Sequence, residues 1–283
     1  MGACLARLGD TLTMVVRAER LEYFPRQIHL ESPLGNVDAT VARAAQVPAC
    51  DVLWITVKAA QLEPALRSVT NPEAVRAIVP LLNGIDHLTL LRKRYGAEKV
   101  IPATIAVESE RIAPGRFVQR SPFARLQVSS TGRDLLGRTL DDLGNIGFDC
   151  RFVDDEPTMM WSKIVFLAPL ALSTSAAGLP VGGVTGDPER RELWQASVHE
   201  AAAVATAEGA KVDAEFVIAG IFKSPAHMRS SMQKDVEQGK VPELDAIAGP
   251  ILRGAQRHGI DVPATNTLVA AVEAKAGLPA SIL

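Results

Sequence analysis

The sequence predicts an α/β fold in which a first half of alternating strands and helices is followed by a second half that is entirely helical. Three observations predict it. Several runs in the first half are apolar almost throughout, which is typical of strands buried on both faces of a parallel sheet. Helix-compatible segments separate these runs, and this rhythm favours an α/β fold. A polar break near residues 152–157 ends the pattern, and only helices are predicted after it.

The predicted strands of the first half are short and end at polar or turn-forming residues. Their runs are "TLTMVV" (11–16), "DVLWITVKA" (51–59), "AVRAIVPLLNG" (74–84) and "KVIPATIAVES" (99–109). Helices are predicted between the runs over "QLEPALRSV" (61–69) and "DHLTLLRKRYG" (86–96). A hairpin with a turn at Pro114-Gly115 follows over 109–130, then a helix over 133–147 and a last strand over 148–155.

The second half carries the signals with which helices start and stop. Asp187 and Pro188 predict an N-cap and a first helical position, and Gly209 is predicted to end that helix. Further helices are predicted over 226–240, 243–259 and 264–277. The stretch 164–186 is free of charge, but its prolines and glycines leave no unbroken apolar run of roughly 18 residues, so no membrane span is predicted.

The composition argues against nucleic acids and metal ions as binding partners of this protein. The net charge is −2 over 283 residues, and acidic and basic residues are interspersed, which argues against a nucleic-acid-binding surface. The three cysteines, Cys4, Cys50 and Cys150, are far apart and fit free thiols in a reducing cytoplasm. Neither they nor the five histidines have the spacing of a metal site, so no metal is predicted.

One ammonium lies inside the most apolar segment of the chain, "MWSKIVFLAPLAL" (160–172). The charged residues nearest to Lys163 are Glu156 before it and Asp187 after it. A lysine in such a segment snorkels to water, pairs with a carboxylate or takes part in chemistry. The segment by itself leaves these three alternatives open.

Eight motifs in order resemble the ketopantoate reductase (2-dehydropantoate 2-reductase) family along nearly the whole chain. They are "VVRAERLEYFPRQIHLESPLG", "DVLWITVKAAQLEPAL", "VPLLNGIDHL", "ERIAPGRF", "WSK", "AVATAEG", "SSMQKDVEQGKVPELDAIAG" and "RHGIDVPATNTL". The resemblance implies a Rossmann-like NADP-binding domain over 1–154 and an all-α domain of the 6-phosphogluconate dehydrogenase type over 155–283. It also implies an NADPH-dependent reductase of a 2-oxo acid, in pantothenate biosynthesis for the family's named reaction, and leaves a homodimer open.

The start of the chain departs from the family pattern. Members open with a strand and a Gly-x-Gly-x-x-Gly turn that holds the cofactor pyrophosphate at a helix N-terminus. The opening "MGACLARLGD" resembles the helix after that turn, so the first strand and its glycines are expected to be missing from this sequence. A misassigned start and a real deletion both account for this.

The resemblance assigns two cationic residues to the cofactor. Arg17, at the end of a predicted strand, matches the arginine that holds the 2′-phosphate of NADP, where an NAD enzyme has an acidic residue. Lys58, in "VKA", matches a lysine beside the cofactor. Read without the family, each is a solvated charge that closes a strand.

Three further residues match the catalytic group of the family. Lys163, of the Trp-x-Lys motif, matches the general acid, which delivers a proton to the carbonyl oxygen as hydride reaches the carbon. Glu243 matches the carboxylate that contacts this lysine and the cofactor ribose, and Asn83 matches an amide between nicotinamide, substrate and lysine. Without the family, Asn83 fits a plain turn and Glu243 a helix N-terminus.

The substrate side of the predicted site is less well kept. Ser231 matches a serine that hydrogen-bonds the substrate carboxylate. Leu167 and Ala171 stand where members usually have substrate-binding asparagines, and Ala248 replaces a third. Apolar groups at these positions favour either a more apolar small-molecule substrate than ketopantoate or a weak ketopantoate reductase. The same departures favour the alternative of a non-catalytic or impaired nucleotide-binding paralogue on the same scaffold.

Overall fold

The computed structural model describes residues 1–280, and these form two compact units. The first unit is α/β and comprises Met1–Leu82 with Leu88–Asp154, whereas the second is helical and comprises the chain from Asp155 onward. The short segment Asn83–His87 belongs to the helical unit although the chain on both sides of it belongs to the first. The predicted α/β fold with a helical C-terminal part is confirmed.

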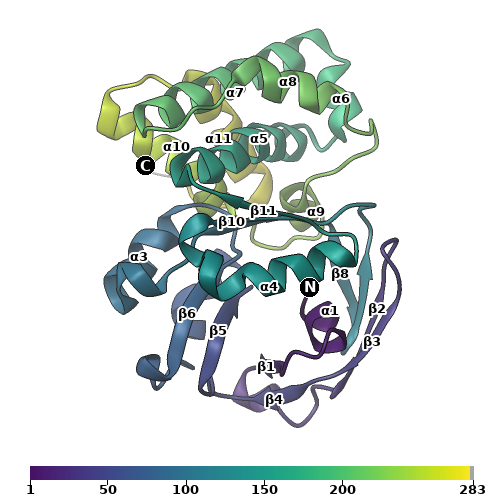
Figure 1. Cartoon of the computed structure of the whole chain (residues 1–283). Coiled ribbons are helices and arrows are strands. Elements are labelled where there is room, and N and C mark those ends of the chain that lie inside the picture. Colours follow the sequence, from purple (N-terminus) through teal and green to yellow (C-terminus); the bar gives the residue numbers. More distant parts are fainter. Residues whose placement is uncertain (281–283) are drawn as a thin grey trace. The chain divides into compact units, whose positions relative to one another are not determined.

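The first unit contains parallel strand pairs (Figure 1). β1 (Thr13–Val15) pairs with β4 (Ala42–Ala44), and β5 (Cys50–Ile55) pairs with β6 (Val75–Pro80). The two pairs are separate two-stranded sheets within residues 1–280.

The other strands of this unit form two mixed sheets. The first has the order β3-β2-β9-β8 and the second β11-β10-β7. Their bounds are β2 (Gln27–Glu31), β3 (Val37–Thr40), β7 (Ala103–Ala106), β8 (Ser109–Ala113), β9 (Arg116–Gln119), β10 (Arg125–Ser129) and β11 (Asp149–Val153). β8 and β9 make the hairpin predicted around Pro114-Gly115. The expectation of one parallel sheet was therefore too simple, because antiparallel pairs β2–β3, β7–β10 and β8–β9 are also present.

Helices complete the first unit. They are α1 (Gly2–Arg7), α2 (Leu62–Leu66), α3 (Asp86–Tyr95) and α4 (Arg133–Asn145). On α4 the buried residues Leu136, Leu140 and Leu143 form an apolar side, and they join the core of this unit. The chain runs from the buried carboxyl end of β6 through Leu81 and Leu82 into Asn83, which is assigned to the helical unit.

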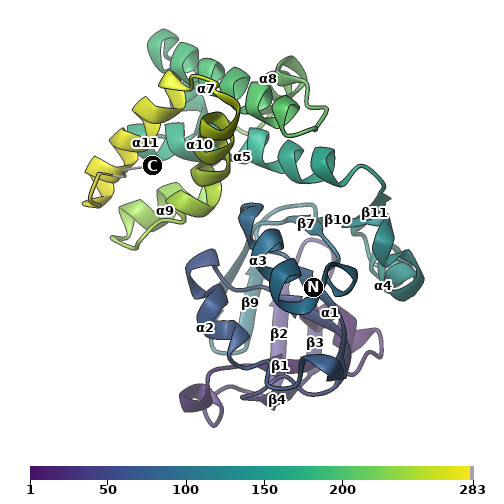
Figure 2. The ribbon, with the colours of Figure 1, turned by 90° about the vertical axis from the view of Figure 1, so that its left-hand side faces the viewer.

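The helical unit is built around α5 (Glu156–Ala177), which packs against α7, α9, α10 and α11 (Figure 2). The remaining helices are α6 (Val181–Thr185), α7 (Pro188–Ala207), α8 (Ala214–Phe222), α9 (Ser231–Glu237), α10 (Leu244–His258) and α11 (Pro263–Ala276). Asp187 caps α7 through the Arg190 amide, as predicted. The helix predicted over 226–240 is shorter, because Ser230 caps it and α9 begins at Ser231.

α5 is the one helix within residues 1–280 that is long and apolar enough to cross a membrane, and 72% of its most apolar window is buried inside the protein. It continues through Pro169 and ends only at Gly178, which has a φ of 69°. Of the residues expected to interrupt the uncharged stretch, Pro169 therefore lies inside the helix. Its apolar character is explained by packing, since residues such as Val165 and Leu172 are fully buried in the helical core.

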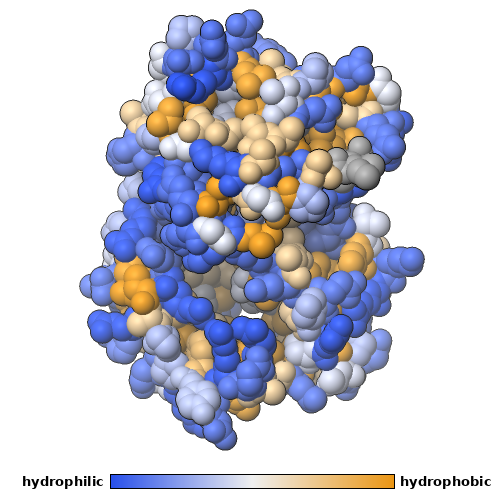
Figure 3. All heavy atoms as spheres, turned by 180° about the vertical axis from the view of Figure 1, so that it is seen from behind, coloured by the Kyte–Doolittle hydropathy of each residue, from blue (hydrophilic) through white to orange (hydrophobic). Residues whose placement is uncertain are grey.

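Side chains on the surface are mixed in character. The face in Figure 3 is largely hydrophilic, and its hydrophobic residues occur in small groups among the hydrophilic ones. Acidic and basic side chains form ion pairs on the surface, for example Arg76 with Asp51 and Arg94 with Glu63. This pattern agrees with a chain whose charges nearly balance.

Candidate active site

The segment Asn83–His87 is held close to α10 by a glycine. Gly84 has a φ of 89°, and a Cβ built on it would lie 2.4 Å from the backbone oxygen of Ala246. Both the positive φ and this contact exclude a side chain at Gly84. The Asn83-Gly84 turn predicted from the sequence therefore has a second purpose, which is to let the backbone of the segment approach α10.

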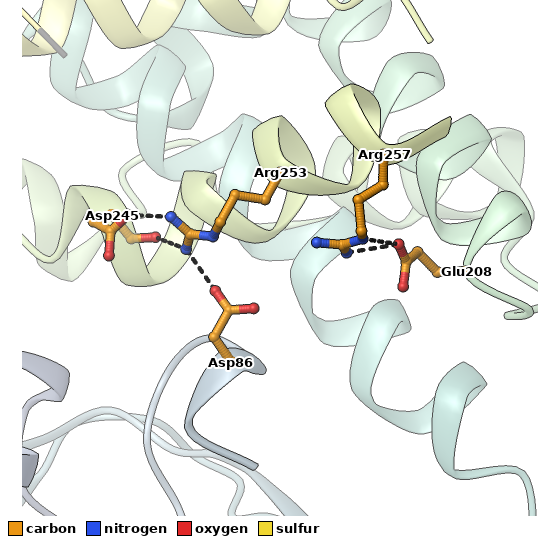
Figure 4. Close-up of polar contacts among 5 residues, drawn as sticks. All are labelled: Asp86, Glu208, Asp245, Arg253 and Arg257. Atoms are coloured by element: carbon orange, nitrogen blue, oxygen red, sulfur yellow. Dashed lines mark hydrogen bonds and ion pairs between the residues drawn. The ribbon is translucent and has the colours of Figure 1, made fainter. Parts of the chain in front are cut away.

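A guanidinium fixes the same segment to α10. Arg253 on α10 donates from Nη2 to Oδ2 of Asp86 at 2.5 Å and from Nη1 to Oδ1 of Asp245 at 2.6 Å (Figure 4). We call Arg253, Asp86 and Asp245 the arginine clasp. A second arginine one turn later, Arg257, pairs with Glu208 instead, which joins α10 to the end of α7.

The clasp region brings two predicted site residues together. Asn83 donates from Nδ2 to Oε2 of Glu243 at 3.4 Å, although 160 positions separate them in the sequence. Glu243 immediately precedes α10 and is its N-cap residue. The hydrogen bond orients the Asn83 amide and leaves its carbonyl oxygen available as an acceptor.

Lys163 completes this group from α5. It lies in the third turn of the helix, among the buried residues Trp161, Ile164 and Val165. Burial lowers the pKa of Lys163 to about 8, and the Glu243 carboxylate opposes this by raising it. Most Lys163 side chains are thus protonated at neutral pH. Their pKa is close to the range in which a lysine exchanges its proton readily. The lowering by burial and the opposing effect of Glu243 favour a lysine that pairs with a carboxylate and takes part in chemistry.

Two family models cover most of the chain. The model described as "Ketopantoate reductase PanE/ApbA" matches residues 1–131, and "Ketopantoate reductase PanE/ApbA C terminal" matches residues 157–276. The chain belongs to the ketopantoate reductase family. As a member it is an oxidoreductase that resembles 2-dehydropantoate 2-reductase.

Individual relatives and solved structures agree with this family. The 2-dehydropantoate 2-reductase of Caulobacter vibrioides is 29% identical over 258 residues, which is 87% of this chain and 86% of the relative. A PanE/ApbA family ketopantoate reductase from Ralstonia eutropha JMP134 has the same fold, with a TM-score of 0.85 and 23% identity over 98% of this chain and 94% of its own. D-mandelate dehydrogenase with NADH and anilino(oxo)acetate superposes with a TM-score of 0.84 and 19% identity, over 98% and 94% of the two chains.

The residues that ketopantoate reductases usually have as asparagines lie one and two turns after Lys163. Leu167 is half-buried and packs against the helical core, and Ala171 is fully buried within that core. An asparagine at position 171 would bury an amide among apolar side chains. Ser231 is exposed and is the first residue of α9, beside the buried capping residue Ser230.

The predicted cofactor residues belong to the α/β unit. Arg17 follows β1 and Lys58 follows β5, so each comes after the carboxyl end of a parallel strand, and both are exposed. The Arg17 guanidinium lies 3.5 Å from the Glu19 carboxylate, with both side chains about two-thirds exposed. Such an exposed pair is weak and leaves Arg17 free to exchange its partner.

The sequence alone missed His87 and the arginine clasp. His87 is buried, and Lys163 contributes to its lowered pKa, so it lies near the Lys163–Glu243–Asn83 group. Its place four residues after Asn83 was the one signal that could have singled it out. Nothing in the local pattern connects Arg253 with Asp86, because 167 positions separate them.

Proposed function

We propose that this protein reduces a 2-oxo acid with NADPH and that Lys163 is the general acid. The observation that carries the proposal is the group of Lys163, Glu243 and Asn83. It joins an ammonium of lowered pKa, a carboxylate and an oriented amide in one place. Membership of a family of oxidoreductases supports the reaction class.

The proposed chemistry divides the reduction between cofactor and protein. A bound nicotinamide supplies the hydride that forms the new C–H bond at the carbonyl carbon. Lys163 stabilises the negative charge that grows on the carbonyl oxygen and transfers its proton to it, which leaves a neutral amine and a 2-hydroxy acid. Solvent then returns the proton to Lys163. Glu243 favours this ammonium electrostatically, and Asn83 is held by Glu243 where it can bind the substrate or the carboxamide.

The donor chemistry of the α/β unit fits a phosphorylated dinucleotide. Arg17 offers a guanidinium that suits the 2′-phosphate of NADPH, and Lys58 offers an ammonium after the neighbouring strand. A 2′-phosphate would replace Glu19 as the partner of Arg17. Glu19 itself lies in the turn after β1. An acidic residue at this place is typical of enzymes that use NADH, so Glu19 favours NADH.

The substrate is proposed to be ketopantoate or a 2-oxo acid with a more apolar side chain. Leu167 and Ala171 present apolar groups where an amide would meet polar substrate atoms, and Ala248 is also buried in the helical core. Ser231 is proposed to hydrogen-bond the substrate carboxylate, since its hydroxyl is exposed at the start of α9.

A panel of 2-oxo acids, read by the loss of NADPH absorbance, tests the proposal. The panel should contain ketopantoate and acids with longer aliphatic and aromatic side chains, each assayed with NADPH and NADH. We expect turnover of at least one 2-oxo acid, with larger kcat/KM for the apolar ones. If none of the acids is reduced while calorimetry still shows NADPH binding, the result would instead support the impaired paralogue, which the replaced amides favour.

Two further properties belong to the proposal. The proposal leaves a homodimer open, which analytical ultracentrifugation across protein concentrations can measure. A cytoplasmic location is expected because Cys4, Cys50 and Cys150 are all free thiols. A sedimentation coefficient of a single chain at all concentrations would contradict the dimer.

A further inference from the structure

His87 is a buried histidine whose Nε2 atom has no hydrogen-bond partner within the part of the chain that the structure describes. Only 8% of the residue surface is exposed. Buried polar atoms in folded proteins are nearly always paired, and each unpaired one costs about 1–3 kcal/mol. An atom that stays unpaired here is explained if its partner is a ligand.

The surroundings of His87 are those of the proposed active site. The residue belongs to the segment Asn83–His87, which also carries Asn83 and its hydrogen bond to Glu243. The arginine clasp holds the neighbouring residue Asp86 to α10 at 2.5 Å. The Gly84 backbone contact fixes the other end of the segment. Both contacts precede His87 in the chain, and they fix the backbone from which its side chain starts.

The imidazole is neutral at physiological pH. Burial is the larger cause that lowers the pKa of His87 to about 4, and the nearby Lys163 ammonium lowers it further. A group with this pKa does not deliver a proton at neutral pH. A neutral imidazole can still donate one hydrogen bond, and other enzymes use a neutral histidine of lowered pKa to polarise a substrate carbonyl.

We propose that His87 is a further substrate-contacting residue, whose neutral imidazole donates a hydrogen bond from Nε2 to an oxygen of the bound 2-oxo acid. The inference rests on the proposed function. An ionised 2-oxo acid has only acceptor oxygens, so the contact requires the tautomer with the proton on Nε2. Lys163 and His87 then bind the substrate with different charges, one as a cation and one as a neutral donor.

Two substitutions at one position separate this role from a merely structural one. His87→Leu removes the unpaired polar atom and keeps an apolar side chain, so we expect a higher melting temperature but a kcat/KM about 10- to 100-fold lower, the scale of a hydrogen bond to a charged group. His87→Gln retains a donor at similar reach and should restore most of that loss. NADPH affinity, measured by calorimetry, should be the same in all three proteins.

His199→Gln is the matched control, because His199 lies on the surface beside Glu215 and should change neither property. The inference is overturned if His87→Leu gains stability and keeps its full kcat/KM, since His87 would then be a buried histidine without a ligand. Should the leucine variant not fold, His87→Asn gives the answer, because its donor ends short of the Nε2 position and kcat/KM must still fall.

The failure of the two proposals can be told apart. A parent protein that reduces no 2-oxo acid overturns both. A parent that reduces one, with a leucine variant of unchanged kcat/KM, overturns the role of His87 alone. An equal loss in the leucine and glutamine variants also contradicts the donor role, because a shared steric effect would explain it.

Discussion

Lys163 combines two properties that conflict in an ordinary core helix. Its neighbours on α5 are buried apolar residues, and its charge is disfavoured by the same burial that lowers its pKa to about 8. Below that pH the protein keeps an ammonium that reduces its stability, because the folded state releases the proton more easily than the unfolded chain. A residue that costs stability in this way is expected to be retained for its chemistry.

Replacing Lys163 by methionine should separate activity from stability. Lys163→Met keeps most of the side-chain volume and removes the buried charge, so we expect kcat to fall at least about 100-fold and the melting temperature to stay or rise. Lys223→Met, at the exposed end of α8, is the control and should leave kcat unchanged. Full turnover by the Lys163 variant would exclude it as the general acid.

The pH dependence follows from the same pKa. Reduction needs the ammonium form of Lys163, so its kcat should be constant below about pH 8 and fall as the pH rises through that value. Oxidation of the 2-hydroxy acid needs the neutral amine and should rise over the same range. Because Glu243 raises the pKa of Lys163, Glu243→Gln should move both profiles to lower pH. Rate profiles of both directions, in parent and variant, measure this.

Arg17 and Glu19 should act in opposite directions on cofactor choice. Arg17→Ala removes a charge-assisted contact with the 2′-phosphate, so NADPH binding should weaken by roughly 1.5–3 kcal/mol while NADH binding stays the same. Glu19→Gln frees Arg17 from its weak ion pair and should tighten NADPH. Calorimetric titrations with both cofactors decide this, and an equal loss for NADPH and NADH in the Arg17 variant would contradict the assignment.

At the scale of elements, the sequence was most informative where residues typical of helix starts are present. Asp187 and Pro188 marked the start of α7. The strands β2, β3 and β4 were missed, because short alternating strands such as β2 resemble polar loops. Helix α8 was also missed, since it is only nine residues long.

The arginine clasp predicts a positioning role for Arg253 on α10. Arg253→Met should loosen the segment that carries Asn83 and His87, so kcat/KM should fall by about tenfold, more than the melting temperature change accounts for. Arg253→Lys should recover part of the loss. Arg257→Met on the same helix breaks the pair with Glu208 and should lower stability alone (Figure 4). If both methionine variants lose activity equally, the clasp has no special relation to the site.

At the scale of the whole molecule, the sequence predicted the α/β-then-helical order, but it could not predict which residues return from one unit to the other. The polar residues at 154–157 are visible in the sequence, and the chain divides after Asp154. The segment Asn83–His87 joins the helical unit through Gly84, Asn83 and the clasp, all of which are tertiary contacts. The residues of the site were found by resemblance, whereas the geometry that joins them was not.

The return of this segment has a consequence for recombination between genes. Consider a chimera that takes its first 154 residues from one family member and the rest from another. Its segment 83–87 would come from the first parent and would pack against an α10 from the second. In the Gly84–Ala246 contact and the Asp86–Arg253 ion pair, one partner would then come from the first parent protein and the other from the second. Such hybrids should work better when codons 83–87 travel with the downstream half, although they lie in the upstream half of the gene.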